Sequence, residues 1–339
     1  MNEEQIEQRK HFAGEKVPSM QRRHDRHDYT EKCFYMVTMT TEDRRPLLGE
    51  LTGMCEAEPG AVDAPAVALS ALGQAVAEAW SAISSYYPQV AVIAGQVMPD
   101  HFHGILYFRE QTDGLHLGHV IRGFKAATNR AFRALCPSLC AATLSQPTME
   151  GRKDPGLLWS KGYNDRILYS YSQLDRWKAY LLDNPRRLLV KRQHPEFFRV
   201  QRNLQFAGLS FSAIGNRFLL DHPVKLQVQC SRRITPEALE QRKSDLLAAA
   251  AQGAVLVSPS VSPGEKAIMR AAFEAGYPLV ILQENGFTDL AKPGGARFDA
   301  CARGQLLLLA PWEHHNERIV IRRDQCLMLN EMARRICEQ

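Results

Sequence analysis

The stretch that decides the fold of the first half of the chain is Met98–Phe108, with the sequence MPDHFHGILYF. Its run of apolar, β-branched and aromatic residues predicts a strand that carries two histidines. Side chains at i and i+2 of a strand share a face, so His101 and His103 face one point while Phe102 enters the opposite layer. Two neutral imidazoles directed at one point suit a divalent metal. The alternative is one buried and one exposed histidine without any ligand.

A second stretch, Trp177–Arg187 with the sequence WKAYLLDNPRR, predicts the end of a helix that begins near Ser172 and stops just before Pro185. Tyr180 and Asn184 are four residues apart and therefore share one face of that helix. An asparagine oxygen is a hard ligand that suits Mg²⁺ or Mn²⁺, and a tyrosine phenol can act as a nucleophile. The alternative is a core tyrosine followed by a helix-ending asparagine.

The two stretches together resemble the HUH single-tyrosine transposases, and within them the REP-associated tyrosine transposase branch. Five blocks match in the family's order across residues 21 to 195: residues 34–45, the His-hydrophobic-His block 97–105, and residues 117–125, 158–167 and 180–185. Five ordered blocks are a specific signal, whereas the histidine pair alone is not.

The resemblance implies a chemistry for these residues. Tyr180 would attack single-stranded DNA, form a 5′-phosphotyrosine and free a 3′-hydroxyl, while His101, His103 and Asn184 would hold Mg²⁺ or Mn²⁺. The substrates that it implies are hairpin-forming, single-stranded repeats, and it leaves monomer and homodimer open. Three other tyrosines compete for the role of nucleophile: Tyr163, Tyr169 and Tyr171. Tyr171 is not excluded, because Asp175 follows it at the spacing of a ligand.

The order of predicted elements supports the same fold from the residues alone. Strands are expected at residues 33–41, 90–97 and 101–108, and amphipathic helices at 64–87 and 117–135. The resulting order β, α, β, β, α predicts a ferredoxin-like antiparallel sheet with its helices on one face. Residues 136–156 are rich in Pro, Ser, Gly and Thr and predict a loop.

Positive charge gathers on one predicted helix and in a tract that follows another. The helix at 117–135 carries Arg122, Lys125, Asn129 and Arg133 at helical spacing, and a second tract beside the proposed nucleophile carries Arg186, Arg187, Lys191 and Arg192. Arg and Lys contacts to phosphates supply most sequence-independent affinity for DNA. We expect these residues to bind DNA. The alternative is that the charged stripe is the solvent-exposed face of the helix.

The composition bounds the class of protein. The chain has 339 residues, 45% of them hydrophobic and 23% charged, which predicts a soluble globular protein of two domains. We expect a cytoplasmic protein that does not act at a membrane, because no apolar run has transmembrane length and the N-terminus lacks a signal-type apolar core. The resemblance implies a bacterial protein that acts at the nucleoid. The eight cysteines show no paired spacing, which favours reduced thiols. A net charge of +5 permits a nucleic-acid partner without requiring one.

The domains are expected as a polar tail at 1–20, an HUH transposase domain at 21–204, a connector at 205–223 and a Rossmann-like domain at 224–339. The basic segment 21–29 is either a phosphate contact or a solvated lead-in. In the last domain, alternating strands (224–230, 254–258, 278–283, 305–310) and helices (235–253, 263–276, 323–338) predict a doubly wound parallel sheet. It loosely resembles the Rossmann-like domains of the DNA-processing and lysine-decarboxylase-like group.

A small ligand of this last domain would bind at the loop 258–266, which leads into a helix N-terminus that could hold a phosphate. Pro263 removes an amide and Glu265 repels an anion, so the alternative is an N-capped helix. Two rival functions therefore remain beside DNA strand transfer. One is a non-catalytic regulator that binds repeat DNA on the same fold, and the other is a nucleotide- or metabolite-binding protein centred on the C-terminal domain.

Overall fold

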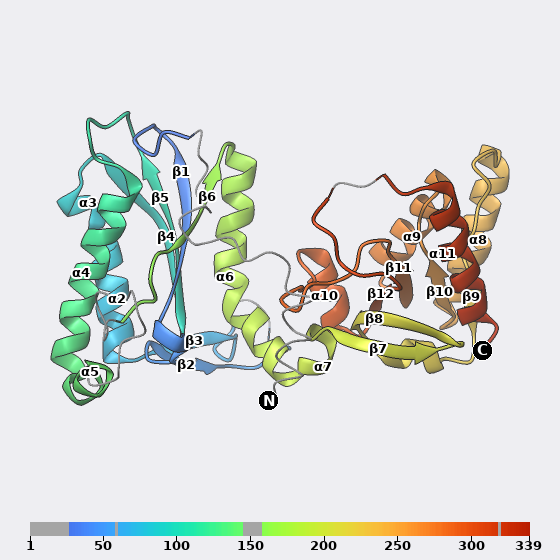
Figure 1. Ribbon diagram of the computed structural model, residues 1–339, viewed down its shortest axis with the longest axis horizontal. Coiled ribbons are helices and arrows are strands. Elements are labelled where there is room, and N and C mark those ends of the chain that lie inside the picture. The colour runs from blue at the N-terminus through green and yellow to red at the C-terminus, as the bar shows by residue number, and fades with distance from the viewer. Residues whose placement is uncertain (1–26, 58–59, 145–157, 318–319) are drawn as a thin grey trace. The chain divides into compact units, whose positions relative to one another are not determined.

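The computed structural model describes residues 27–57, 60–144, 158–317 and 320–339 (Figure 1). The chain divides into two compact units, and the division falls between Leu189 and Val190. The predicted tail at 1–20 and most of the basic segment 21–29 lie outside the described residues. In the part of the chain that is described, every helix is too short or too polar to cross a membrane.

The first unit is built on a four-stranded antiparallel sheet. Its strands are β1 (Phe34–Thr40), β4 (Val90–Met98), β5 (His101–Phe108) and β6 (Asn164–Leu168), in the spatial order β4-β5-β1-β6. Numbered along the chain, this order is 2-3-1-4, which is that of a ferredoxin-like sheet. The predicted fold class of this unit is therefore confirmed. The register pairs Thr40 with His101 and Thr38 with His103 across β1 and β5.

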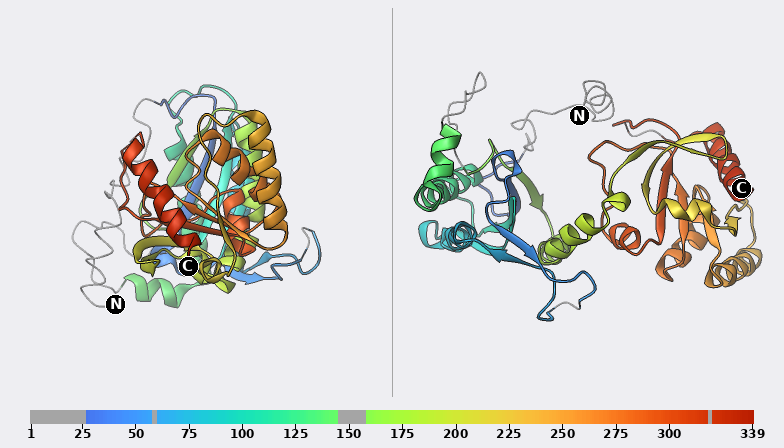
Figure 2. Two further views of the ribbon diagram at one scale, coloured as in Figure 1. Left: turned by 90° about the vertical axis from the view of Figure 1, so that its right-hand side faces the viewer. Right: turned by 90° about the horizontal axis from the view of Figure 1, so that it is seen from below.

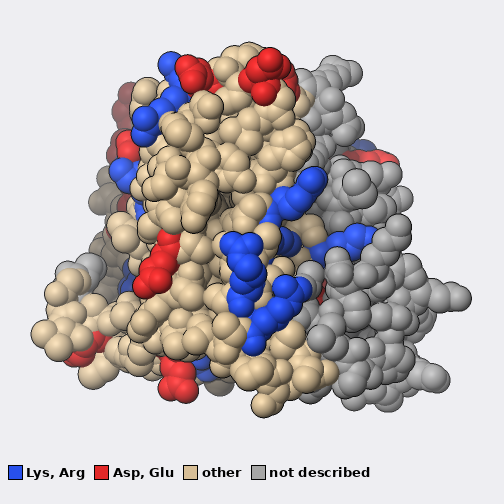
Figure 3. Space-filling model, turned by 90° about the vertical axis from the view of Figure 1, so that its left-hand side faces the viewer, with Lys and Arg blue, Asp and Glu red and all other residues tan. Residues whose placement is uncertain are grey.

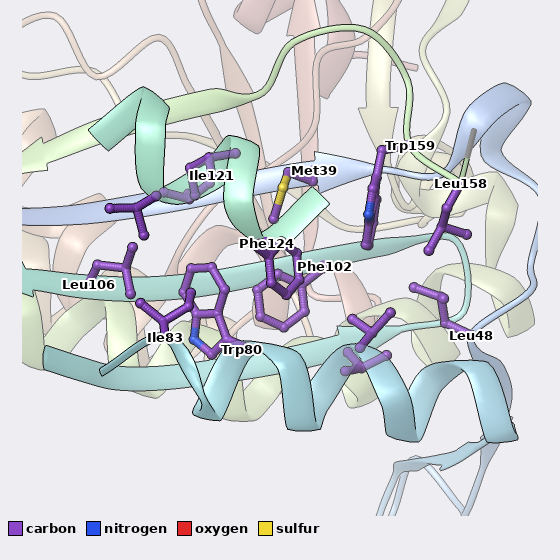
Figure 4. Close-up of a cluster of buried hydrophobic side chains, with 14 of the residues drawn as sticks. Met39, Leu48, Trp80, Ile83, Phe102, Leu106, Ile121, Phe124, Leu158 and Trp159 are labelled. Carbon is purple, nitrogen blue, oxygen red and sulfur yellow. The ribbon is translucent and has the colours of Figure 1, made fainter. Parts of the chain in front are cut away.

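One face of this sheet is covered by α2 (Ala71–Ser81), α3 (Ile83–Tyr86) and α4 (Leu117–Leu135). Their core is aromatic: Trp80 lies 4.7 Å from Phe102 and 5.2 Å from Phe124 between ring centroids (Figure 4). Trp80 also donates its Nε1–H to the Ala94 carbonyl at 3.0 Å. A Cβ at Gly104 would lie 2.1 Å from Trp80 Cζ2, so the indole ring reaches this position because the residue on β5 is glycine.

The two helices that the order β, α, β, β, α placed on one face do share it, and the opposite face of the sheet is covered by α6 (Tyr171–Gln193). Figure 1 shows α2 and α4 on one side of the sheet and α6 on the other. Leu174 and Leu181 of α6 pack against Met36 and Ile105 of the sheet. The helix also continues through Pro185, where it was expected to stop. Packing of the residues around Pro185 outweighs the loss of one backbone hydrogen bond, which costs about 3 kcal/mol with the ring clash.

Two further expectations for this unit are corrected. Residues 66–69 were expected to begin a helix, but they form β3 (Ala66–Leu69), which pairs with β2 (Gly49–Thr52). The helix starts after Ser70, whose hydroxyl accepts a hydrogen bond from the Gly73 amide and caps it. Part of the predicted loop at 136–156 is α5 (Pro137–Leu144).

The second unit contains a six-stranded mixed sheet with the order β7-β8-β12-β11-β10-β9. Its strands are β7 (Gln201–Phe206), β8 (Leu209–Gly215), β9 (Lys225–Gln227), β10 (Val255–Ser258), β11 (Leu279–Leu282) and β12 (Leu306–Ala310). The strands β9 to β12 are parallel, and β8 pairs antiparallel with β12. The predicted connector at 205–223 is therefore wrong, because its alternation of apolar residues and serines forms a strand with Phe211 and Ala213 buried.

The helices of this unit are α7 (Pro195–Phe198), α8 (Pro236–Ala251), α9 (Pro263–Glu274), α10 (Ala296–Ala302) and α11 (Arg323–Cys337). Leu329 and Ile336 of α11 pack on one face of the strands, against Val257 and Val280. In the left view of Figure 2, α11 lies on one side of the strands and α8 and α9 lie on the other. The predicted class, an α/β unit with a parallel sheet, is confirmed. In detail, the parallel strands follow one another in sequence order and carry the antiparallel hairpin β7–β8 at β12.

Candidate active site

The two histidines of β5 lie together on the face that α6 covers. Their ring centroids are 4.8 Å apart, and the side chains of His101 and His103 are 14% and 7% exposed. Ile105, two residues further along the same face, packs in the cluster that contains α6 residues. The predicted shared direction of the histidines is therefore observed, and both rings face the helix rather than solvent.

Each imidazole is held through its Nδ1 atom. His101 Nδ1 lies 2.6 Å from Asp100 Oδ1, and His103 Nδ1 lies 2.8 Å from Thr38 Oγ1. The Thr38 hydroxyl can donate to Met36 Sδ at 3.6 Å, which leaves its oxygen to accept the proton of His103 Nδ1. Both partners thus favour the proton on Nδ1 and the lone pair on Nε2. This arrangement orients and fixes metal-binding histidines in other proteins.

Asp100 is an ionised carboxylate beside His101. Burial raises its pKa, but the hydrogen bond to His101 and the positive charge of Arg44, 3.2 Å away, outweigh this effect and lower the pKa to about 2. The sequence interpretation did not assign a role to Asp100 or Thr38. Asp100 could have been noticed beside His101, whereas Thr38 is revealed only by the pairing of β1 with β5.

Tyr180 of α6 meets the histidine pair. Its ring centroid lies 5.9 Å from that of His103, at an interplanar angle of 70°. The competing Tyr171 lies 5.9 Å from Phe34, which pairs with Tyr107 at the other end of β5 from His101. Among the candidate tyrosines, the structure therefore brings Tyr180 to the histidines and holds Tyr171 away from them.

Asn184 lies one turn beyond Tyr180 in α6 and is 4% exposed. Its amide Nδ2 is buried and has no hydrogen-bond partner among the described residues. An unsatisfied buried polar atom costs about 1–3 kcal/mol, so such atoms are rare without a function. The two amide positions interchange by a flip of the side chain, which would turn Oδ1 toward the unsatisfied position. A hard cation bound there fits this residue, although the described chain holds no group of three His, Cys, Asp or Glu residues arranged for a metal.

Two residues of α4 that were predicted to contact DNA make hydrogen bonds within the protein. Lys125 donates from Nζ to the carbonyls of Ser160 at 2.9 Å and Gly162 at 2.5 Å, and burial lowers the pKa of its ammonium to about 8. Asn129 is 8% exposed and accepts a hydrogen bond from the Leu158 amide at 3.0 Å. Both side chains tie residues 158–162 to α4, so each has a structural role, and their binding to DNA stays a prediction.

The remaining cations of α4 stay at the surface. Arg122, Arg130 and Arg133 are exposed, and α4 contains no acidic residue. Figure 3 shows the side of the molecule that carries this helix, where Lys and Arg side chains gather in the middle of the face and acidic ones lie above, below and to the left of them. Because α4 and α6 cover opposite faces of the sheet, this surface is separated from Tyr180 by the sheet itself.

The basic residues of α6 differ in their surroundings. Arg186 donates two hydrogen bonds to the Asp183 carboxylate, from Nε to Oδ1 at 2.6 Å and from Nη2 to Oδ2 at 3.0 Å. Arg187 is 12% exposed, lies 3.7 Å from Asp183, and places its Cζ 5.5 Å from the centre of the Tyr180 ring. Lys191 and Arg192 belong to the last turn of α6, beyond the boundary of the first unit. Arg186 and Arg187 therefore have intramolecular roles whether or not they also contact DNA.

The predicted phosphate loop of the second unit is filled by its own chain. Glu265 is 1% exposed, and its carboxylate accepts hydrogen bonds from the amides of Val261, Ser262 and Cys230 at 2.8, 3.1 and 3.1 Å. Ser262 completes a capping box at the start of α9. The N-capped alternative is thus observed, and these amides are not available to a phosphate.

No protein-family model matches the chain. An uncharacterized protein of Haemophilus influenzae is 22% identical over 162 residues, which cover 47% of this chain and 83% of that protein. Fold and site together define a ferredoxin-like unit with a histidine pair facing a helix tyrosine, followed by an α/β unit.

Three solved structures show a distant likeness. A REP-associated tyrosine transposase bound to a REP hairpin is 16% identical, with a TM-score of 0.31, over 48% of this chain and 72% of that chain. A candidate transposase from Deinococcus radiodurans is 17% identical, with a TM-score of 0.27, over 48% of this chain and 96% of that chain. DNA processing protein A from Helicobacter pylori, a single-stranded DNA binder, is 18% identical, with a TM-score of 0.31, over 41% of this chain and 66% of that chain. Scores this low carry no functional argument, so the functional proposal depends on the residues of this chain.

Proposed function

We propose that this protein nicks single-stranded DNA and transfers the cut strand, with Tyr180 as the nucleophile. The observation that supports this proposal best is the ring of Tyr180 at 5.9 Å from that of His103, on the sheet face where His101 and His103 lie together. A tyrosine needs help to react at neutral pH, because its ordinary pKa is about 10. A site that combines this tyrosine with two oriented histidines offers such help.

The reaction exchanges one phosphodiester for another. The Tyr180 oxygen forms a bond to the scissile phosphorus, the bond from phosphorus to the 3′ oxygen breaks, and the proton lost by the phenol is balanced by the one that the 3′ oxygen gains. The products are a 5′-phosphotyrosine and a free 3′-hydroxyl. The new bond stores the energy of the broken one, so a second 3′-hydroxyl can attack it and rejoin the strand without a nucleotide cofactor.

His101 and His103 through Nε2, and Asn184 through Oδ1, would hold Mg²⁺ or Mn²⁺. When bound, such an ion withdraws charge from the phosphate and orients the leaving oxygen. Asp100 and Thr38 keep the imidazoles in the tautomer that this requires. Few protein ligands suit Mg²⁺, which usually retains several waters.

The substrate and the setting belong to the same proposal. Hairpin-forming repeat DNA is what the sequence resemblance implies. The exposed arginines of α4, with Arg122 among them, offer a phosphate-binding surface for a part of the DNA that lies away from Tyr180, because α4 and α6 cover opposite faces of the sheet. We place this activity in the bacterial cytoplasm, at the nucleoid. Tyr180 and all three proposed metal ligands come from one chain, so the chemistry does not require a homodimer.

The test is incubation of an end-labelled, single-stranded hairpin DNA with the full chain and Mg²⁺ or Mn²⁺. We expect a protein–DNA adduct that survives denaturing electrophoresis, and its loss in Tyr180→Phe and His101→Ala. Tyr171→Phe is the matched control, because this tyrosine lies on the same helix but away from the histidines, and it should form the adduct normally. An adduct that persists in Tyr180→Phe contradicts the proposal. DNA binding without any adduct in the wild type would favour the non-catalytic regulator instead.

A further inference from the structure

The side of α6 that carries Tyr180 continues into a row of alternating cations and aromatic rings. Arg166 of β6 places its Cζ 5.1 Å from the centre of the Trp177 ring, and Trp177 lies 5.2 Å from Tyr180. Arg187 covers the Tyr180 ring at 5.5 Å. These distances fall within the range of cation–π and aromatic contacts. The row leads directly away from the proposed nucleophile.

The outer part of this row is accessible. Arg166 is exposed on β6, which is an edge strand, and no described carboxylate forms an ion pair with it. Trp177 is half-buried, because part of its ring packs on the cluster that holds α6 to the sheet. At the other end, Arg187 is 12% exposed and lies beside Asp183. Arg187 therefore positions the Tyr180 ring, whereas Arg166 and Trp177 have surface left for a ligand.

The chemistry of this pair fits a single-stranded nucleotide. Bases of single strands stack on aromatic rings and on the planes of arginine guanidinium groups, and a neighbouring cation attracts the phosphate. A double helix does not offer an unstacked base, so an indole covered by a guanidinium discriminates in favour of single strands. An arginine without a carboxylate partner keeps its charge for a phosphate.

We propose that Arg166 and Trp177 form a base-stacking platform for a nucleotide next to the scissile phosphate. This inference rests on the proposed function, because Tyr180 defines which phosphate is cut. The base stacks on the Arg166–Trp177 layer, Arg166 also contacts the adjoining phosphate, and the strand is thereby delivered to Tyr180. The platform binds by stacking rather than by reading base edges, so it accepts any of the four bases.

The test is equilibrium binding of a fluorescein-labelled oligothymidylate of about 15 nucleotides to the full chain, followed by fluorescence anisotropy. EDTA is present, so the readout does not depend on cleavage. Stacking on one aromatic ring contributes about 1–3 kcal/mol, so Trp177→Ala should weaken binding roughly 5- to 150-fold. Trp177→Phe keeps a stacking ring and should stay within about threefold of the wild type. Arg166→Ala should weaken binding and reduce the slope of log K against log salt by about 0.7.

Tyr86→Ala is the matched control, because Tyr86 is an aromatic residue 79% exposed on α3, in the layer on the other face of the sheet. It should bind like the wild type. Wild-type affinity in Trp177→Ala, an equal loss in Tyr86→Ala, or a loss in Trp177→Phe as large as in Trp177→Ala would each overturn the platform. The two proposals can fail separately. A wild-type protein that forms no adduct would contradict strand transfer, but the binding measurement would remain valid. Normal adduct formation together with unchanged affinity in Trp177→Ala would contradict the platform alone.

Discussion

Replacing Gly104 by alanine tests how closely the core beneath the histidine pair is packed. The new Cβ would lie 2.1 Å from Trp80 Cζ2, about 1.5 Å short of the optimum for two carbon atoms. Trp80 cannot move away easily, because it is 2% exposed and donates its Nε1–H to the Ala94 carbonyl at 3.0 Å. The alternative is a displacement of β5, which carries His103 next to Gly104.

The expected loss of stability follows from these contacts. Overpacking of a core costs about 1–3 kcal/mol, and loss of the Trp80 hydrogen bond adds about 1 kcal/mol. For a unit of this size, a loss of about 2–4 kcal/mol lowers the Tm on the order of 5–15 °C. Thermal unfolding monitored by circular dichroism measures this shift. Gly123→Ala on α4 is the control: its Cβ would lie 2.5 Å from the Tyr87 hydroxyl oxygen, which is the far end of a half-buried side chain and can shift, and alanine is favoured in a helix by about 1 kcal/mol.

The clash with Trp80 can be separated from other effects by a double-mutant cycle. Phenylalanine lacks the part of the indole that Gly104→Ala would strike, so Trp80→Phe should relieve the damage by at least about 1 kcal/mol. A Gly104→Ala protein whose free energy of unfolding lies within about 0.5 kcal/mol of the wild-type value would refute the packing argument. An equal cost of Gly104→Ala in the Trp80→Phe background would show that the clash lies elsewhere.

Three further predictions concern side chains that support the two units. Asp100→Asn should lower the rate of adduct formation about 10- to 100-fold, because His101 loses the carboxylate that orients it; an unchanged rate in single-turnover kinetics would contradict this role. Lys125 has a folded-state pKa of about 8, below the ordinary value of about 10.4. The unfolded chain therefore binds more protons between these values, and the wild type should gain stability relative to Lys125→Met as the pH rises from about 8 to about 10, measured by urea unfolding. Glu265→Ala removes the acceptor of three backbone amides and should destabilise the second unit by about 2–4 kcal/mol in denaturant titrations, whereas a loss below about 1 kcal/mol would contradict its capping role.

Local pattern predicted the elements on which the site is built. The alternation in Met98–Phe108 predicts the strand and the shared direction of His101 and His103, and both are observed. The periodicity of residues 117–135 predicts α4 with its observed bounds. The proximity of Tyr180 to His103 was expected from the ordered blocks of sequence, and the structure brings the two rings together.

Roles that depend on distant partners were not predictable. Lys125 and Asn129 have the spacing of a surface stripe, but both form hydrogen bonds with residues 158–162. No local sequence pattern predicts this contact. Pro185 is a reliable helix terminator in isolation, yet burial of Leu181 and Asn184 against the first unit keeps α6 helical through it. The contact between Trp177 and Arg166 was likewise not predictable, because it joins a helix to a strand and no local sequence pattern covers both.

The most direct test of the central claim is to find the atom that carries the DNA. The adduct formed with single-stranded hairpin DNA and Mn²⁺ is digested with nuclease and trypsin, and the nucleotide-bearing peptide is sequenced by mass spectrometry. The account predicts a nucleotide esterified to Tyr180 and a free 3′-hydroxyl on the released strand. A nucleotide on Tyr163, Tyr169 or Tyr171 would contradict it, as would a wild-type protein that cleaves the hairpin and leaves Tyr180 unmodified.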